Sequence, residues 1–152
     1  MTLAGLLERA ASRRPDAEAV VDGDQRLTYA ALAERCAAVA RGLSRLGVGT
    51  GDRVLIALKN RVEHVVVYWA LQTLGGVPTP VNFRFAPGEM RYVLEDSGAK
   101  LALYESVTAP AVMGAVGGPG MPLVCVGADT RVGSIAFASS GARAGSERSG
   151  VF

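Results

Sequence analysis

The stretch "RVLIALKN", residues 53–60, begins with an almost uninterrupted apolar run. Such a run is typical of a strand that is covered on both faces, as the strands of parallel sheets are. The glycines of "GVGTG", residues 47–51, come just before it. They follow a helical pattern and precede the strand, whereas a dinucleotide site needs the order strand, glycines, helix. We therefore expect a helix-to-strand turn at these glycines and a buried strand at residues 53–58.

Helical and strand patterns alternate after this strand, which predicts an α/β fold with a parallel sheet flanked by helices. Its crossover connections should be right-handed. Ligands in such folds bind at the carboxyl ends of the strands, here residues 59–60, 82–84, 105–106 and 127. The patterns place helices at residues 62–74, 87–96 and 107–116, and strands at residues 77–82, 100–105 and 122–127.

Before the glycines, the sequence predicts two helices joined by a β-hairpin. Apolar residues recur at helical spacing from residue 2 to residue 14, and Pro15 follows them. Two short strands are expected on either side of Asp22-Gly23-Asp24. Thr28 has the side chain and position of an N-cap for a second helix that reaches Leu46.

The helix at Val62–Leu74 is apolar on almost every side, which is typical of a buried helix. Asn60 and Glu63 have the spacing of a capping box at its start. His64 is the only histidine of the chain. We interpret it as a structural residue, because a catalytic base needs a partner carboxylate and a cleft.

Composition and charge exclude several classes of protein. The net charge of the 152 residues is only +2 and the cations are scattered, so a nucleic-acid partner is not expected. There is no run of 18 apolar residues, hence no expected membrane span, and the first residues lack the pattern of a secretory signal. Cys36 and Cys125 have no metal-ligand spacing and are expected to be thiols in a reducing cytoplasm.

Several short motifs are spread over residues 1–126. They are Leu27-Thr28-Tyr29, Gly51-Asp52-Arg53-Val54, Leu74-Gly75-Gly76-Val77, Asn82, and the helix with Glu89, Tyr92, Leu94, Asp96 and Ser97. With these motifs the segment resembles the beginning of an adenylate-forming (AMP-dependent) ligase, the superfamily of acyl-CoA synthetases, peptide adenylation domains and luciferases. The variant "VNFR", residues 81–84, is more similar to acyl-CoA or aryl-CoA synthetases. Ala31 and Ala86 depart from the pattern, in which a Glu and a capping Thr are usual.

This resemblance implies a two-step ligase that uses ATP, Mg²⁺ and CoA. A carboxylate would attack the α-phosphate of ATP to give acyl-AMP and pyrophosphate, and a thiol would then take the acyl group. No catalytic or metal-binding residue is expected in this segment, because the family's chemistry is carried mostly by residues further along. The acid substrate is left open by the sequence. Arg84 is the candidate for a contact with a nucleotide or CoA phosphate, and a solvated loop arginine is the alternative.

The family's phosphate loop has the approximate form [ST]-S-G-[ST]-T-G-x-P-K-G. Ser139, Ser140 and Gly141 match it, but the Thr hydroxyls are absent and Glu147 stands near the place of the lysine. A carboxylate there would repel a triphosphate. We therefore expect an AMP-binding segment at residues 1–128 and a flexible, low-complexity tail at residues 129–152. A shift of reading frame after about residue 130 is our hypothesis for the change in composition.

Two functions follow from these expectations. The first is a truncated acyl-CoA synthetase-like protein that is inactive alone and binds no cofactor by itself, because both family lysines are missing. The second is a non-catalytic α/β module that associates with itself or with a partner. Its surface would be the apolar helix Val62–Leu74, left uncovered in a segment of a larger fold.

Overall fold

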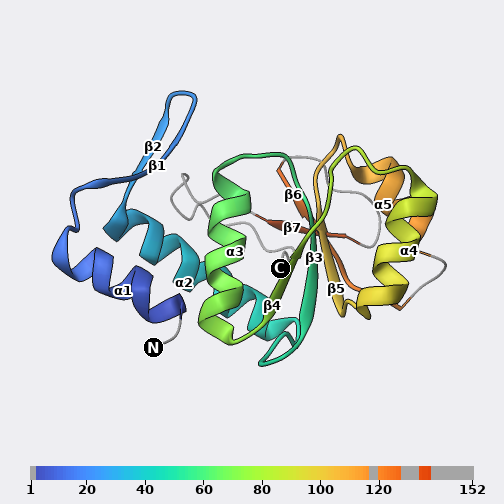
Figure 1. The fold of residues 1–152 in the computed structure, drawn as a ribbon, viewed down its shortest axis with the longest axis horizontal. Coiled ribbons are helices and arrows are strands. Elements are labelled where there is room, and N and C mark those ends of the chain that lie inside the picture. Colours follow the sequence, from blue (N-terminus) through green and yellow to red (C-terminus); the bar gives the residue numbers. More distant parts are fainter. Residues whose placement is uncertain (1–2, 117–119, 128–133, 138–152) are drawn as a thin grey trace, which may run out of the picture. The chain divides into compact units, whose positions relative to one another are not determined.

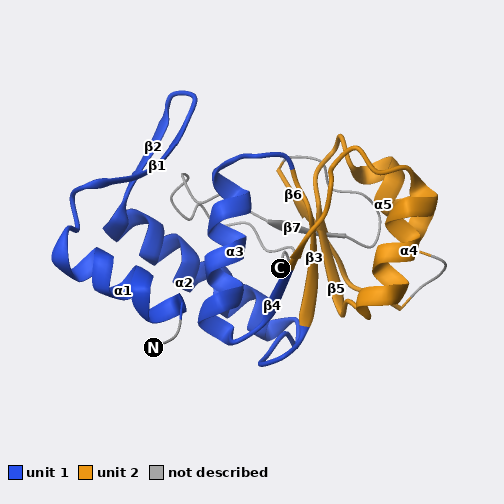
Figure 2. Cartoon of the chain, in the orientation of Figure 1, with its two compact units in different colours: residues 1–52, 59–78 blue, residues 53–58, 79–152 orange. Residues whose placement is uncertain are grey.

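The computed structural model describes residues 3–116, 120–127 and 134–137. The chain divides into two compact units (Figure 2). Unit 1 contains residues 1–52 and 59–78, and unit 2 contains residues 53–58 and 79–152. The phosphate-loop residues Ser139 to Glu147 lie outside the described residues, so what the sequence predicts for them stays a prediction.

Unit 1 is a helical unit with one β-hairpin, as the sequence predicts. Its elements are α1 (Leu3–Arg13), β1 (Glu18–Asp22), β2 (Gln25–Thr28), α2 (Tyr29–Arg45) and α3 (Val62–Leu74). The hairpin is antiparallel and turns at Gly23, whose φ of 57° favours glycine. The three helices pack on one another, and α2 contributes Leu32, Cys36, Val39, Ala40 and Leu43 to the buried side chains.

The starts of α2 and α3 are capped in different ways. The hydroxyl of Thr28 accepts a hydrogen bond from the Ala31 amide at 3.2 Å, which confirms the predicted N-cap of α2. The predicted capping box of Asn60 and Glu63 is wrong. Helix α3 has Arg61 as its N-cap residue, without a side-chain cap, and the Val62 amide donates to Asp22 Oδ2 at 3.0 Å.

The sheet belongs mainly to unit 2 and has the order β4-β3-β5-β6-β7 (Figure 1). The pairs β3–β5, β5–β6 and β6–β7 are parallel, which confirms the predicted fold class. Strand β4 is at an edge, where Pro78 and Pro80 cost no ladder hydrogen bonds. The strands are β3 (Arg53–Ala57), β4 (Val77–Pro80), β5 (Leu101–Tyr104), β6 (Leu123–Val126) and β7 (Ser134–Phe137).

Two helices of unit 2, α4 (Pro87–Ser97) and α5 (Ala109–Ala115), lie on the same side of this sheet (Figure 1). They form a core with the strand residues that point toward them. Leu55 and Ala102 are register partners in this core, and so are Tyr104 and Cys125. The alternate residues Val54, Ile56, Leu101 and Leu103 are also fully buried, so β3 and β5 are covered on both faces, as predicted.

Strand β7 was not predicted. The sequence pattern placed the last strand at residues 122–127 and an irregular tail after residue 128, but β7 pairs in register with β6. Four residues poor in charge and flanked by Gly and Ala give too weak a pattern to be distinguished from a low-complexity tail. None of the helices in the described parts of the chain is long and apolar enough to cross a membrane.

Candidate functional site

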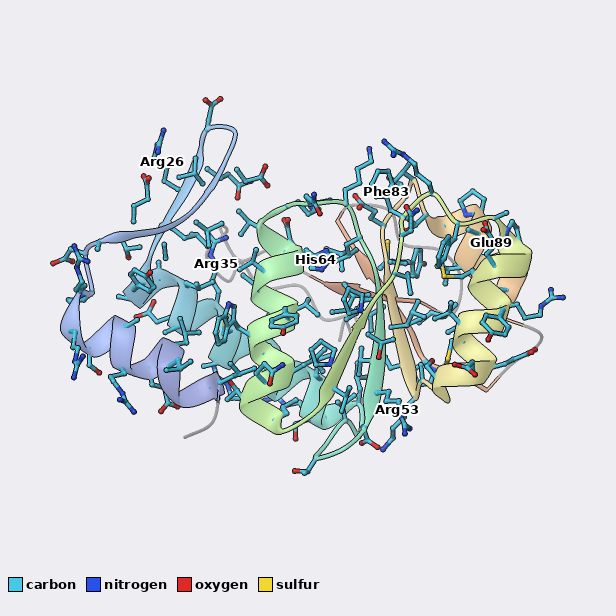
Figure 3. All side chains as sticks on the ribbon, viewed as in Figure 1. Arg26, Arg35, Arg53, His64, Phe83 and Glu89 are labelled. Atoms are coloured by element: carbon cyan, nitrogen blue, oxygen red, sulfur yellow. The ribbon has the colours of Figure 1, made fainter. Side chains whose placement is uncertain are left out.

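The carboxyl ends of the strands in unit 2 meet at one edge of the sheet. Strand β4 runs in the same direction as β3, because two hydrogen bonds advance together along both segments. The Val77 amide donates to Asp52 O at 2.8 Å, and the Val81 amide donates to Ile56 O at 3.1 Å. Figure 3 shows Phe83 and Glu89 at this edge and Arg53 at the opposite end of the strands. The prediction that the segments after β4, β5 and β6 share this edge is therefore confirmed by the parallel strand order.

The loop after β4 is held rigid by its own hydrogen bonds. Asn82 Oδ1 accepts from the Arg84 amide at 3.0 Å, and Asn82 O accepts from the Phe85 amide at 3.1 Å. An Asn side chain that folds onto the backbone two residues later is an Asx turn, which fixes the chain without a partner element. The loop consequently presents Phe83 and Arg84 in defined positions.

Arg84 is exposed, and its guanidinium carbon lies 5.0 Å from the centroid of the Phe83 ring. A guanidinium over an aromatic face is held by cation–π attraction and still directs its N–H groups outward. No carboxylate of the described residues forms an ion pair with Arg84. Its charge is therefore available to an anion in solution.

Helix α4 begins directly after this loop, and Glu89 stabilises its start. Glu89 Oε2 accepts from the Ala86 amide at 2.9 Å. The reciprocal half of a capping box is absent, because Ala86 has no side-chain acceptor. The Glu89 carboxylate thus stabilises the start of α4 and forms no ion pair with Arg84.

The neighbouring turn between β5 and α5 contains two buried polar side chains, Glu105 (6% exposed) and Thr108 (0% exposed). The Thr108 hydroxyl donates to Ala57 O at 2.7 Å and accepts from the Glu105 amide at 3.0 Å. The Glu105 carbonyl accepts from the amides of Thr108 and Ala109, at 3.0 Å and 2.9 Å. This turn is thus fixed to the last residue of β3.

The sequence identified Glu105 only as a strand end, and the role of Thr108 was missed. The signal that could have found it was the spacing: a Thr three residues beyond the end of a buried strand and just before Ala-Pro marks a turn that opens a helix. Ser106 and Gly127, the other residues predicted at this edge, are exposed, and Gly127 has a φ of 114°. Lys59 and Asn60 are also exposed but belong to unit 1.

His64 does not have the surroundings of a general base. It is half-buried on α3, and its Nδ1 atom is buried without a hydrogen-bond partner among the described residues. No carboxylate of that part of the chain therefore orients its ring through this atom, as catalysis would require. This agrees with the structural interpretation of this histidine.

Glu63, beside His64, forms a short ion pair with Arg61, from Nε to Oε2 at 2.6 Å. Burial raises the pKa of Glu63. The hydrogen bonds from Arg61 and the backbone, together with the charges of Arg61 and Arg35, outweigh this and lower the pKa below its usual value. Glu63 is thus a paired structural carboxylate and is not suited to accept a proton near neutral pH.

Both cysteines are buried free thiols. Burial raises the pKa of the Cys36 thiol to about 12, so this thiol is unreactive near neutral pH.

The large apolar side chains of α3 are buried or half-buried, and Tyr68 packs edge-to-face on Trp69 at 6.1 Å. Val65, Tyr68, Trp69 and Leu74 are its half-buried apolar side chains, and association through Val62–Leu74 stays a prediction. The exposed large apolar side chains of the described residues are Leu3, Leu6, Val21, Val77, Tyr92 and Val107.

Comparison with known proteins gives a consistent result. The family model "AMP-binding enzyme" matches residues 7–142. The chain is 37% identical to the long-chain-fatty-acid–CoA ligase FadD13 of Mycobacterium tuberculosis over 133 residues, which are 82% of this chain and 26% of that protein. It therefore spans about a quarter of the length of this curated relative.

Solved structures show the same fold. A benzoate CoA ligase from Burkholderia xenovorans superposes with a TM-score of 0.77 and 26% identity, over 82% of this chain and 26% of that one. A fatty acyl CoA synthetase from Mycobacterium tuberculosis gives a TM-score of 0.72 and 32% identity, over 74% of this chain and 23% of that one.

Proposed function

Because the chain belongs to the AMP-binding enzyme family, we propose that it supplies the N-terminal part of a ligase that activates a carboxylic acid with ATP and transfers it to CoA. In the first step a carboxylate oxygen bonds to the α-phosphorus of ATP, and the bond to pyrophosphate breaks. In the second step the thiol sulfur bonds to the acyl carbon and AMP leaves. The identity to acyl-CoA ligases supports this proposal.

The observation that carries the proposal is the exposed charge of Arg84, unpaired among the described residues, at the carboxyl edge of the sheet. Its role is to bind a phosphate of ATP or of CoA. A planar guanidinium forms paired hydrogen bonds with phosphate oxygens. The Asx turn of Asn82 orders the loop before binding, which reduces the entropy lost when a ligand binds to it. The Phe83 ring lies against the guanidinium, and Arg84 is exposed to solvent.

No step of this proposal depends on a metal held by the described residues. Within the described part of the chain, no three His, Cys, Asp or Glu side chains gather where they could hold an ion. Mg²⁺ commonly reaches such reactions with the nucleotide, bound by its phosphates. In this proposal it therefore enters the reaction as part of the ATP substrate.

We further propose that these 152 residues alone do not complete the reaction. The reason is chemical: Glu147 stands where the family's phosphate-loop lysine is expected, and like charges repel. The cytoplasmic location expected from the sequence belongs to this proposal too. The alternative is an interaction module that uses α3, whose half-buried apolar side chains are Val65, Tyr68, Trp69 and Leu74. The family match favours the ligase proposal over it.

Binding of nucleotide phosphates to the chain tests the proposal directly. In NMR titrations with ATP and, separately, CoA, we expect the Arg84 side-chain signal and the Phe83–Phe85 amides to shift. Arg84→Gln should weaken the binding of the nucleotide about tenfold, as expected for the loss of one charge-assisted hydrogen bond. Arg84→Lys should recover part of the affinity, because it keeps the charge without the planar fork.

Arg26→Gln is the matched control. Arg26 is also exposed, but it is paired with Glu18 at 2.7 Å on the hairpin of unit 1. Equal losses in the two Gln variants would mean that Arg84 acts only through net charge. If neither nucleotide shifts the loop, the phosphate role of Arg84 is refuted. An ATP–pyrophosphate exchange signal with any carboxylic acid would overturn the proposed inactivity.

A further inference from the structure

We propose that Thr108 is a positioning residue: its hydroxyl couples the β5–α5 turn, through β3, to the loop that carries Arg84. This coupling rests on the proposed function only for its ligand-binding consequence. The coupling itself depends on hydrogen bonds within unit 2.

The Thr108 hydroxyl is turned away from the helix that it precedes. Thr108 is the N-cap residue of α5, but its side chain makes no cap hydrogen bond to that helix. A Thr at this position ordinarily accepts from the helix backbone, which is worth about 1 kcal/mol. In this chain the hydroxyl points back to the strands and accepts from the Glu105 amide. Its hydrogen can be donated to Ala57 O at 2.7 Å or to Glu105 O at 3.1 Å, and the shorter distance favours Ala57 O.

The partner of Thr108 on β3 connects it to the loop on the other side of that strand. Successive carbonyls of a strand point in opposite directions within the sheet. Ile56 O accepts from Val81 at the end of β4, at 3.1 Å, and Ala57 O accepts from Thr108 on the β5 side. Two consecutive residues of β3 therefore bind the segments on its two sides. Val81 immediately precedes Asn82, whose side chain and carbonyl fix the Arg84 loop.

Burial makes this link specific. Thr108 is fully buried, and Ala57 has no exposed surface. Without the hydroxyl, Ala57 O would lose this donor away from water, and the Glu105 amide would lose this hydrogen bond. We expect the end of β3 to shift as a result. Because Ile56 O binds the Val81 amide, such a shift would displace the Arg84 loop relative to the β5–α5 turn.

The variants Thr108→Val, Thr108→Ser and Thr108→Cys test this coupling. Val keeps the shape and removes the hydroxyl, Ser keeps the hydroxyl, and Cys keeps a weaker donor. The matched control is Thr28→Val, which removes the hydroxyl of another N-cap Thr, in unit 1. Amide hydrogen exchange is measured at Glu105, Arg84 and Phe85, together with the binding of ATP and CoA.

In Thr108→Val we expect exchange at Glu105, Arg84 and Phe85 to rise about tenfold more than in Thr28→Val, the effect of losing one buried hydrogen bond. Thr108→Ser should restore wild-type protection, and Thr108→Cys should fall between the two. If the wild type binds a nucleotide, its affinity should follow the same order.

Unchanged protection of Arg84 and Phe85 in Thr108→Val, beyond the change in Thr28→Val, would overturn the coupling. Failure of Thr108→Ser to restore that protection would overturn it too. If Thr108→Val does not fold, the Ser and Cys variants decide the question by the same comparison. A wild type that binds neither ATP nor CoA would refute the role of Arg84, while the exchange data would still judge Thr108.

Discussion

Helices α2 and α3 of unit 1 begin in opposite ways. Helix α2 is capped by Thr28, the residue directly before it. The first amide of α3 is bound instead by Asp22, which lies 40 residues earlier, at the end of β1. Thr28 therefore stabilises a local structure, whereas Asp22 joins the hairpin to a helix that is distant in sequence. The comparison teaches that a cap can serve the tertiary structure more than the helix it caps.

The largest effect is expected from breaking the distant cap. Asp22→Ala removes a carboxylate that accepts a hydrogen bond from the Val62 amide. The negative charge of this carboxylate also interacts favourably with the positive end of the α3 dipole. We expect a loss of about 1–2 kcal/mol in the free energy of unfolding, measured with urea. Hydrogen exchange should rise in both β1–β2 and the first turn of α3.

Asp22→Asn is the control for this variant, because it keeps an oxygen acceptor and removes only the charge. It should lose less stability than Asp22→Ala. Equal losses in the two variants, or faster exchange confined to α3, would contradict the role of Asp22 in joining the hairpin to the helix.

Breaking the local cap should cost less. Thr28→Ala removes the acceptor of the Ala31 amide, and we expect a loss of about 1 kcal/mol in the free energy of unfolding. Thr28→Ser should restore it. Faster exchange should stay within the first turn of α2, in contrast to Asp22→Ala, and an effect that reached β1 would remove the distinction between the two caps.

A third helix start extends the comparison, because here a substitution should add a cap where the other two remove one. Helix α4 has half a capping box, formed by Glu89, and lacks the acceptor that Ala86 cannot provide. Ala86→Thr should add the missing bond and raise the free energy of unfolding by about 0.5 kcal/mol. The same substitution combined with Glu89→Gln provides the control, and a decrease in stability for Ala86→Thr alone would show that the loop geometry rejects the bond.

The smallest effect is expected in acid, at the second residue of α3. The pKa of Glu63 is lowered in the folded chain, so this group stabilises the fold above its unfolded pKa of about 4.3. That stabilisation is lost as the pH falls through the lower, folded pKa. Urea unfolding of wild type and Glu63→Gln between pH 3 and 7 should show a steeper acid loss in the wild type, and parallel curves would contradict this assignment.

These helix starts also show which parts of the fold the sequence could predict. The Thr28 cap joins two residues that are only three positions apart in the sequence, so spacing alone identified it. The cap of α3 depends on where the hairpin lies in three dimensions, and the local pair Asn60 and Glu63 gave the wrong answer. Glu63 instead binds Arg61, two residues earlier. No periodicity contains such information.

The candidate site follows the same division. Alternating patterns were enough to predict that the loop of Arg84 and the turn of Glu105 lie at one edge of a parallel sheet. Spacing could have identified Thr108 as the residue that opens a helix, but not its hydrogen bond to Ala57, which is 51 residues away. The apolar pattern predicted that α3 is buried, but composition does not distinguish whether its own chain or another covers it.

The position of β3 has a consequence for the order in which the chain is made. Residue Val54 pairs with Leu101, and Ala57 pairs with Tyr104. A ribosome therefore releases this almost wholly apolar strand well before its partner β5 exists. Until then the nascent chain carries an exposed segment of the kind that aggregates or recruits chaperones.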